Sequence, residues 1–227
     1  MERGIYMVII MLGAQGTGKG TVAGLISQQM GWPQISTGDI FRKNLSEKTE
    51  LGNKANEYMA KGELVPDEIT VPMVINRLKE EDAQQGAILD GFPRTIQQAE
   101  KLDEILQGFG KKVDLVVNLQ TPKEELIDRM LTRRVCTNQD CKATYNIKLN
   151  PPKVEGICDK CGSSLKQRED DCNSEAIHKR LQIYEEQTSP LVEYYENKGV
   201  LRTETVSTSI NRMGKDVAED IVRDIKK

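Results

Sequence analysis

The sequence predicts an α/β protein built on a parallel β-sheet that is covered by helices. The chain of 227 residues alternates short apolar runs with longer segments of helical periodicity, which is typical of such a sheet. Several of the apolar runs are nearly continuous, as expected for strands that are buried on both faces. A chain of this length buries about 70% of its unfolded surface, so its core needs no disulfide bonds.

Five segments are predicted to be the strands of this sheet. They are Val8–Leu12, Gln34–Ser36, Gly86–Leu89, Val113–Leu119 and Val200–Thr205. The apolar run that contains the first of them is too short for the core of a signal peptide, and no small-residue cleavage site follows it. We therefore predict a buried strand there and a cytoplasmic protein.

Helices are predicted between these strands. Lys19–Met30 follows the first strand directly, and the last residues, from about Lys215, also have a helical pattern. Two further segments carry apolar residues at helical spacing. They are marked by Val71, Val74, Ile75 and Leu78 in one and by Ile177, Leu181 and Tyr184 in the other.

Another helix is predicted to begin at Thr121. Pro122 follows at the first helical position, and Glu124 lies three residues after the threonine. This is the pattern of a capping box with a well-placed proline. The threonine side chain would then accept a hydrogen bond from the backbone of the first helical turn.

The charge balance argues against several classes of partner. The chain has 32 basic and 35 acidic residues, and its net charge of -3 provides no general attraction to nucleic acid or anionic lipid. No segment of the sequence reaches the roughly 18 consecutive apolar residues that cross a bilayer. We therefore expect neither a nucleic-acid partner nor a membrane partner.

A glycine-rich segment, Gly13–Thr21, lies between the first predicted strand and the following helix. Gly13 and Gly18 are separated by four residues and Lys19 comes next, which matches a phosphate-binding loop. Glycines let successive backbone N–H groups point into one concavity, and the positive end of the helix adds to the attraction. Lys19 would supply a point charge to the β- and γ-phosphates. The alternative is a plain glycine-rich turn, but the lysine and the flanking elements favour phosphate binding.

One position departs from the general phosphate-loop pattern. The Ser or Thr that usually follows the lysine is replaced by Gly20, and Thr21 comes one residue later. Either Thr21 or a water molecule must then complete the coordination of Mg²⁺.

The Gly-Lys-Gly-Thr ending of this loop and several later segments resemble the adenylate kinase family. These segments are Ser36-Thr37-Gly38-Asp39-Ile40-Phe41-Arg42, Asp90-Gly91-Phe92-Pro93-Arg94 followed by Gln97-Gln98, Arg129-Met130-Leu131-Thr132-Arg133-Arg134, and Arg168 with Asp170-Asp171 and Arg180. The resemblance runs from about Met7 to the C-terminus. It departs at Gln15, where the family usually has proline, and by one extra residue between Arg168 and Arg180.

The resemblance implies a role for each matched residue. The residues implied in ATP binding, with Arg129 covering the adenine, are Gly13, Gly16, Gly18, Lys19, Gly20, Thr21, Arg129 and Arg133. The residues implied in AMP binding are Thr37, Arg42, Gly91, Arg94, Gln98, Arg168 and Arg180. The residues implied in catalysis are Lys19, Asp90, Arg94, Arg133, Arg168 and Arg180, with Asp90 reaching Mg²⁺ through water.

The resemblance also implies the architecture. A core of the P-loop NTPase type, with a five-stranded parallel sheet, would comprise residues 1–36, 67–130 and 166–227 of a monomer. A small helical insert, residues 37–66, would close over AMP, and a zinc-ribbon-like lid, residues 131–165, would close over ATP. Closure would exclude the water that otherwise accepts the phosphoryl group.

The matched arginines suit this chemistry on physical grounds. Phosphoryl transfer between nucleotides requires positioning and charge neutralisation, with little covalent work by the protein. Arginine keeps its charge and offers phosphate a bidentate fork. Any single arginine could instead form a surface ion pair, but four separate motifs agree. Arg134, which adjoins Arg133, is expected to be only a solvated or structural charge.

Specificity for the acceptor is also partly readable. Thr37 and Gln98 occupy the positions where the family reads the acceptor base. A glutamine amide can exchange hydrogen bonds with an adenine edge in both directions. AMP is therefore favoured over UMP or CMP.

Four of the five cysteines fall into two pairs. Cys136 and Cys141 are separated by four residues, Cys158 and Cys161 by two, and sixteen residues lie between the pairs. Paired cysteines in a small, loop-rich segment favour a closed structural Zn²⁺ site, which would supply the stability that so small a core lacks. Disulfides, an iron–sulfur cluster and unligated thiols are the alternatives.

Cys172 and His178 are predicted to take no part in the chemistry. Cys172 follows two aspartates, which oppose formation of a thiolate. His178, the only histidine, falls on the polar face of a predicted helix.

These observations together predict the reversible reaction ATP + AMP = 2 ADP. GTP as the donor is the alternative within the same class, because the donor base is contacted largely by backbone and by stacking. A catalytically silent nucleotide-binding regulator and a zinc-ribbon nucleic-acid protein are alternatives from other classes. Lys19, Asp90 and the lid arginines argue against the former, and the net charge argues against the latter.

Overall fold

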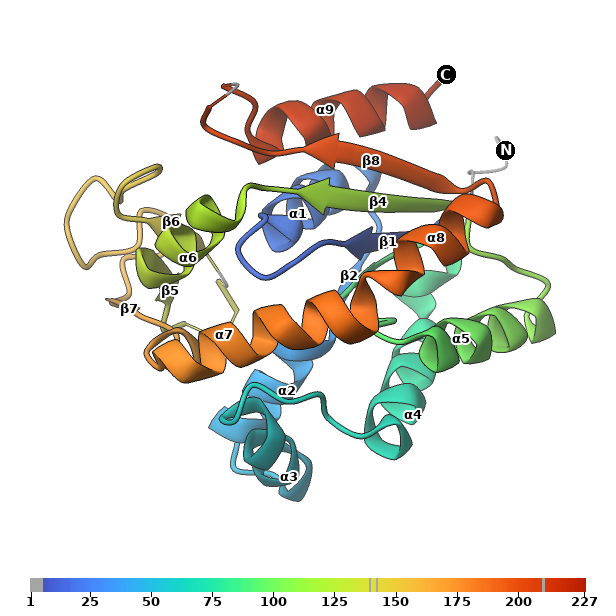
Figure 1. The fold of residues 1–227 in the computed structure, drawn as a ribbon, viewed down its shortest axis with the longest axis horizontal. Coiled ribbons are helices and arrows are strands. Elements are labelled where there is room, and N and C mark those ends of the chain that lie inside the picture. The colour runs from blue at the N-terminus through green and yellow to red at the C-terminus, as the bar shows by residue number, and fades with distance from the viewer. Residues whose placement is uncertain (1–5, 139, 142, 210) are drawn as a thin grey trace.

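The computed structural model describes residues 6–227 except 139, 142 and 210, and its centre is a five-stranded parallel sheet (Figure 1). The strands stand in the order β2-β3-β1-β4-β8. Their bounds are Val8–Leu12 (β1), Gln34–Ser36 (β2), Ala87–Asp90 (β3), Leu115–Gln120 (β4) and Leu201–Thr205 (β8). The predicted fold class is confirmed, and every strand boundary lies within two residues of its predicted position.

Helices cover both faces of this sheet. The bounds of those that pack on it are Lys19–Met30 (α1), Asp67–Leu78 (α4), Ile96–Gly108 (α5), Pro190–Asn197 (α8) and Gly214–Ile225 (α9). Successive side chains of β1 point to opposite faces, so the strand serves two separate cores. Val8 and Ile10 pack with α4, α5 and α8, whereas Ile9 and Met11 pack with α1 and α9.

Two helices lie next to the phosphate loop. The bounds are Lys123–Leu131 (α6) and Ser174–Ile183 (α7). Leu126 and Met130 of α6 pack with Ile177 and Leu181 of α7 and with Ala14 of the loop. A π-helical turn over Tyr184–Thr188 joins α7 to α8, and two short 3₁₀ turns occur at Glu81–Gln85 and Glu169–Asp171.

The capping box predicted at Thr121 is wrong. The residue that precedes α6 is Pro122, and no side chain caps this helix. The Thr121 hydroxyl instead donates to the backbone carbonyl of Val206, at 2.6 Å. The hydroxyl is therefore bonded to the segment that follows β8. Helix α6 begins at Lys123, two residues after Thr121, where the sequence predicted the helix to begin.

Two small helices, Thr37–Ser46 (α2) and Glu50–Met59 (α3), project from the sheet on the side where α4 begins (Figure 1). Ser36 caps α2 by accepting a hydrogen bond from the backbone N–H of Asp39, and Thr49 caps α3 in the same way at Gly52. Phe41, Ala55 and Val65 form a separate small core here. These helices lie in the segment that we predict to close over AMP.

A second projection carries the cysteines. Its three antiparallel strands are Arg133–Cys136 (β5), Thr144–Asn146 (β6) and Leu165–Lys166 (β7), in the order β6-β5-β7. Its buried side chains are few and include two cysteines, Cys136 and Cys158, with Ala143 and Tyr145. Such a core is too small to stabilise the segment by apolar burial alone.

Substituting Gly52 by alanine should destabilise the protein by about 1–3 kcal/mol, because overpacking forces the backbone apart. A Cβ at Gly52 would lie 2.3 Å from backbone atoms of Asn44 and Leu45, where α2 and α3 meet. Gly108→Ala is the matched control, because a Cβ there meets nothing within 4 Å. The control should leave stability unchanged or raise it by up to about 1 kcal/mol. Urea denaturation would measure both changes, and equal effects would contradict the packing argument.

Candidate functional site

The phosphate loop passes close to both β4 and α6. Gly13, Gly16 and Gly18 have positive φ values of 132°, 91° and 94°. A Cβ at Gly13 would lie 2.4 Å from the carbonyl oxygen of Leu119, and one at Gly16 would lie 2.9 Å from that of Leu126. Glycine is therefore required for the backbone conformation at all three positions, and for space at the first two.

Lys19 folds back over this loop. Its Nζ donates to the backbone carbonyls of Gly13, at 2.6 Å, and Ala14, at 2.9 Å. The buried hydroxyl of Thr17 donates to the same Ala14 carbonyl, at 2.9 Å. Burial lowers the pKa of Lys19 to about 8, with Asp90 opposing the shift and nearby arginines adding to it. Phosphate oxygens could replace the carbonyls as partners of this ammonium.

Asp90 ends β3 beside the start of α1. Its Oδ2 accepts a hydrogen bond from Nε2 of Gln34, at 3.2 Å. A Cβ at Gly20 would lie 3.5 Å from this same oxygen, whereas Cγ2 of Thr21 lies within 3.9 Å of a Cβ built on Gly214. Position 20, which carries a Ser or Thr hydroxyl in most phosphate loops, thus faces Asp90. The exposed Thr21 lies on the side of α1 toward α9.

The segment after Asp90 forms a tight group with Thr37. Arg94 Nε and the Thr37 hydroxyl both donate to the carbonyl of Gly91, at 2.9 and 3.0 Å. A Cβ at Gly91 would lie 2.9 Å from the Thr37 hydroxyl, so this approach also needs glycine. The Thr188 hydroxyl donates to the carbonyl of Arg94, at 2.9 Å, and ties the segment to the α7–α8 turn.

Gln98 is buried with both ends of its amide engaged. Its Oε1 accepts from the backbone N–H of Arg94, at 2.7 Å, and its Nε2 donates to Asp67, at 2.6 Å. One N–H and one lone pair of the amide remain for a base. The buried amide is therefore held in a single orientation between Arg94 and Asp67.

Arg42 forms an ion pair with Asp39 in the first turn of α2. Burial would raise the pKa of Asp39, yet the Arg42 guanidinium and the Ser36 hydroxyl hold it below its usual value. Arg42 is thus kept near Arg94 without a phosphate present.

Two aspartates, Asp170 and Asp171, form ion pairs with Arg133, Arg168 and Arg180, which are called the lid arginines below. Arg133 donates through Nε and Nη2 to Asp171, at 2.7 and 2.8 Å, and Arg168 donates through the same atoms to Asp170, at 3.0 and 2.6 Å. Nη1 of Arg180 lies 3.1 Å from Asp170 and 3.5 Å from Asp171. Burial would raise the pKa of Asp170, yet Arg168 and Arg180 hold it well below its usual range.

The extra residue between Arg168 and Arg180 does not remove Arg180 from this group. Asn173 caps α7, and its side chain accepts hydrogen bonds from the backbone N–H groups of Glu175 and Ala176. Arg180, on the capped helix, keeps its ion pairs with Asp170 and Asp171.

Positive charge converges on the ends of β1 and β3 from several separate segments. Burial lowers the pKa of Arg94 to about 10, and the charges of Arg180, Arg42 and Arg168 add to this shift. Burial also lowers the pKa of Arg133 to about 10, again with Arg168 adding to it. Mutual repulsion of this kind is relieved when an anion binds.

Arg129 and Arg134 stand apart from these charges. Arg129 is 8% exposed and pairs with Glu125 at 2.8 Å. Arg134 donates to the backbone carbonyls of Leu131 and Arg133, at 3.2 and 2.8 Å, as expected of a structural charge. Arg129, the arginine predicted at the ATP base, thus pairs with a different carboxylate from those that pair with Arg133, Arg168 and Arg180.

The sulfur atoms of the four paired cysteines all lie within 4.8 Å of one another. All four are free thiols, with Sγ–Sγ distances of 3.4 Å for Cys136 and Cys161 and 3.6 Å for Cys141 and Cys158. Four thiolates about 2.3 Å from a tetrahedral Zn²⁺ would lie about 3.8 Å apart. The donor set and its spacing therefore fit zinc.

His178 is exposed, as predicted, and Cys172 is an exposed free thiol. The Cys172 thiol lies 3.2 Å from the carbonyl of Arg168, and a ring nitrogen of His178 lies 2.8 Å from the carbonyl of Ser174. Both contacts are local to the start of α7.

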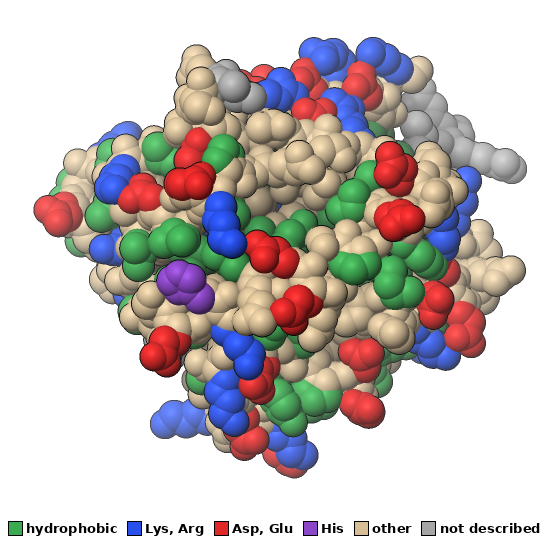
Figure 2. Space-filling view, viewed as in Figure 1, with side chains coloured by type: hydrophobic (Ala, Val, Ile, Leu, Met, Phe, Trp, Pro, Cys, Tyr) green, Lys and Arg blue, Asp and Glu red, His purple; other side chains and the backbone are tan. Residues whose placement is uncertain are grey.

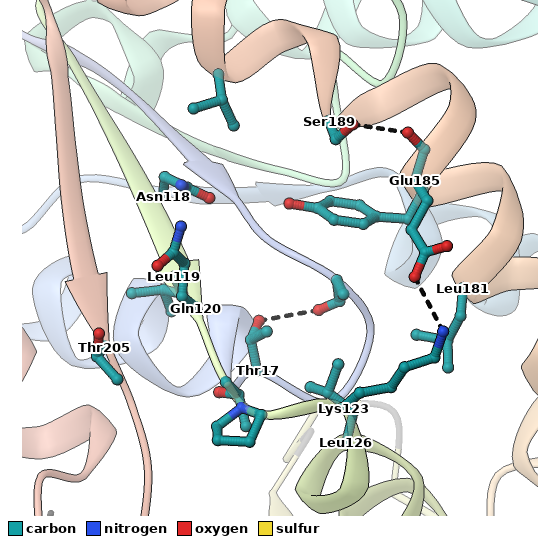
Figure 3. A pocket seen from close by; sticks show the side chains of 15 residues that line it. Thr17, Asn118, Leu119, Gln120, Lys123, Leu126, Leu181, Glu185, Ser189 and Thr205 are labelled. Atoms are coloured by element: carbon teal, nitrogen blue, oxygen red, sulfur yellow. Dashed lines mark hydrogen bonds and ion pairs between the residues drawn. The ribbon is translucent and has the colours of Figure 1, made fainter.

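A pocket lies beside the phosphate loop and takes part of its lining from that loop (Figure 3). It has a volume of 550 Å³, and Thr17, Asn118, Gln120 and Leu181 are among the residues that line it. None of the residues predicted to bind nucleotide belongs to its lining. The predicted site residues are instead those of the group of charges described above.

The surface mixes charges of both signs. Figure 2 shows acidic and basic side chains interspersed over one face of the molecule. Among the described residues, none of the helices has the length and apolar character that crossing a bilayer requires.

Sequence reasoning assigned no role to the partners that hold these residues. Gln34, Thr188, Asp170 and Asp171 each fix one of the predicted side chains or segments. Only the two aspartates had a local signal, because they follow Arg168 almost directly in the chain.

Comparison with known proteins decides the family. A family model described as adenylate kinase matches residues 11–200, which include the phosphate loop, the Asp-Gly-Phe-Pro-Arg segment and the lid arginines. The chain belongs to the adenylate kinase family. The resemblance stated from the sequence motifs is thereby confirmed.

Curated relatives cover nearly the whole chain. The adenylate kinase of Caldicellulosiruptor saccharolyticus is 51% identical over 211 residues, which are 93% of this chain and 97% of the relative. That of Lachnospira eligens is 55% identical over 196 residues, with coverage of 86% and 91%. That of Caldanaerobacter subterraneus subsp. tengcongensis is 49% identical over 221 residues, with coverage of 97% and 95%.

Gln15 stands where adenylate kinases usually have proline. Glutamine leaves φ free and gives the phosphate loop a backbone N–H that proline lacks. Its side-chain Oε1 is buried without a hydrogen-bond partner among the described residues. The substitution therefore adds a donor to the loop and leaves one side-chain acceptor unsatisfied.

The shifted pKa of Lys19 predicts how nucleotide affinity depends on pH. Below about pH 8 the ammonium is protonated and attracts phosphate; as the pH rises through 8, the free protein loses this charge. The Kd for MgATP should therefore rise several-fold between about pH 7.5 and 9.5, when measured by calorimetry. Lys19→Arg keeps its charge over this range and should flatten the rise. A Kd that does not change with pH in the unsubstituted protein would contradict the assignment.

Proposed function

We propose that this protein transfers the γ-phosphoryl group of MgATP to AMP, reversibly, giving two ADP. The observation that carries the proposal is the convergence of Lys19, Arg94, Arg133 and Arg180, whose charges act on one another from separate segments. Such a density of buried positive charge suits several phosphates brought together. Membership of the adenylate kinase family supports the same reaction.

Each charged group has a proposed place in the reaction. The phosphate loop and Lys19 hold the β- and γ-phosphates of the donor, and Arg42 and Arg94 hold the phosphate of AMP. Arg133, Arg168 and Arg180 release Asp170 and Asp171 and turn to the group in transfer. Arginine forks suit this exchange because they bind carboxylate and phosphate with the same geometry. The attacking oxygen is already anionic, so no general base is required.

Asp90 would hold Mg²⁺ through water. Its carboxylate is bonded to a neutral amide and not to an arginine, so it remains available to a hydrated cation. Because Thr21 lies on the far side of α1, water completes the coordination in place of a protein hydroxyl. When bound, Mg²⁺ neutralises the charge that develops on the β- and γ-phosphate oxygens.

The acceptor base is proposed to meet Thr37 and Gln98. The Gln98 amide is oriented by Arg94 and Asp67, so it offers a fixed donor and acceptor to the adenine edge. ATP is the proposed donor, and turnover with GTP in its place tests the alternative. Nothing in the group of charges itself distinguishes the two purines.

The mobile parts are proposed to be residues 37–66 and 131–165. Each has its own small core, with few apolar contacts to the sheet. Closure of both over the substrates would exclude water from the transferred group. We further propose that the protein acts as a cytoplasmic monomer.

The four cysteines are proposed to hold a structural Zn²⁺. A closed Cys₄ site contributes to folding and leaves no position open for chemistry. It lies within the lid and is separate from the charges that would surround the phosphates.

An assay for ADP formed from ATP and AMP tests the function. We expect turnover by the unsubstituted protein and a loss of about 100-fold or more in kcat/KM in Lys19→Met, because the phosphates lose their principal point charge. Lys123→Met is the control, since Lys123 is an exposed lysine paired with Glu185. Binding of both nucleotides without any transfer would favour the silent regulator.

Metal analysis tests the zinc proposal. We expect about one equivalent of zinc per chain, and we expect Cys158→Ser to lose the metal and to melt at a lower temperature. Activity at low temperature should largely remain, because the site is structural. Cys172→Ser should change neither metal content nor melting. Loss of turnover in Cys158→Ser with unchanged melting would refute a structural role.

A further inference from the structure

Glu125 forms a cluster that the proposed reaction does not use. It lies one turn before Arg129 on α6, and its Oε2 accepts from Nη2 of that arginine at 2.8 Å. The same oxygen accepts from the backbone N–H of Thr208, at 3.2 Å, and Oε1 accepts from the hydroxyl of Ser207. One carboxylate therefore joins α6 to the segment that follows β8.

Arg129 depends on this carboxylate for neutralisation. Its side chain is 9% exposed, and Glu125 is its partner among the ion pairs of the described residues. Nη2 also donates to the carbonyl of Val206, at 3.3 Å, whereas the buried Nε has no partner within the part of the chain that the structure describes. A buried guanidinium that loses its counter-charge is destabilised in place and moves toward water.

A second pocket opens beside this pair. It has a volume of 220 Å³, and Glu125, Arg129, Leu149 and Thr208 help to line it. Leu149 comes from the lid and Thr208 from the β8–α9 segment, so the pocket brings together parts far apart in sequence. A flat guanidinium beside an apolar side chain suits a stacked purine.

We propose that Glu125 is a positioning residue for the donor nucleotide. By pairing with Arg129 and bonding Ser207 and Thr208, it holds the guanidinium plane as a fixed surface on which the donor base stacks. Glu125 itself does not touch the reacting atoms. The inference rests on the proposed function and on the place at the ATP adenine that the family resemblance implies for Arg129.

The experiment compares Glu125→Gln with Glu124→Gln. Glu124 is an exposed carboxylate at the rim of the same pocket. We expect Glu125→Gln to raise KM for MgATP about five- to tenfold, an effect of the size of one stacked base. KM for AMP and kcat should stay within about twofold, since Arg129 lies apart from the other arginines. Glu124→Gln should change none of these values.

A base-free donor analogue separates stacking from charge. Magnesium tripolyphosphate, used as a competitive inhibitor against ATP, should have the same inhibition constant in Glu125→Gln as in the unsubstituted protein. An inhibition constant that rises together with KM for ATP would overturn the proposal, because the carboxylate would then act through phosphate. An unchanged KM for ATP, or an equal rise in KM for AMP, would overturn it as well.

Two further variants guard against misfolding. Ser207→Ala removes one bond of the cluster and no charge, and it should raise KM for ATP about twofold in the same direction. In an Arg129→Ala background, Glu125→Gln should have no further effect on KM for ATP, and an additive effect would contradict positioning through Arg129. Calorimetric Kd values for MgATP test the same point without turnover. If the protein bound MgATP but transferred no phosphoryl group, the proposed function would be refuted, and the calorimetric Kd values would still test this inference.

Discussion

The structure depends on keeping many positive charges close together before any phosphate arrives. Arg42, Arg94, Arg168 and Arg180 act on one another across a buried region, and such repulsion would separate them unless something opposed it. Asp170 and Asp171 oppose it for the lid arginines, and Asp39 does so for Arg42. The aspartates thus offset the repulsion and hold the arginines close to one another.

The fold brings these charges together by means of short contacts to backbone. The phosphate loop and the Asp90 segment leave β1 and β3 on the same edge of the sheet, because neighbouring parallel strands end side by side. The α7–α8 turn then reaches across and bonds the carbonyl of Arg94 through Thr188. Arg180, on α7, is thereby held on the same rigid support as the acceptor side.

Features of the fold could be predicted from the sequence where neighbouring residues alone determine them. Buried strands are continuous apolar runs, and the glycines of the phosphate loop are required by its own backbone, so both could be predicted. Thr121 was misread because its hydroxyl bonds Val206, which is 85 residues away. Separations of 38 and 82 residues likewise hid the pairing of Arg133 with Asp171 and the hydrogen bond that Ser207 donates to Glu125. Pairings of this kind depend on the completed fold and have no periodicity to reveal them.

Because Asp170 and Asp171 pair with the lid arginines, an anion that binds these arginines must first compete with the two carboxylates. The two carboxylates are tethered beside the arginines, so their effective concentration is far above that of any dissolved ion. Chloride or a single inorganic phosphate has to displace carboxylates that are part of the same chain and cannot diffuse away. A nucleotide that is already bound through its other phosphates and its base also has a high effective concentration at the arginines. The pairing therefore favours a ligand that is held at several points over a single small anion.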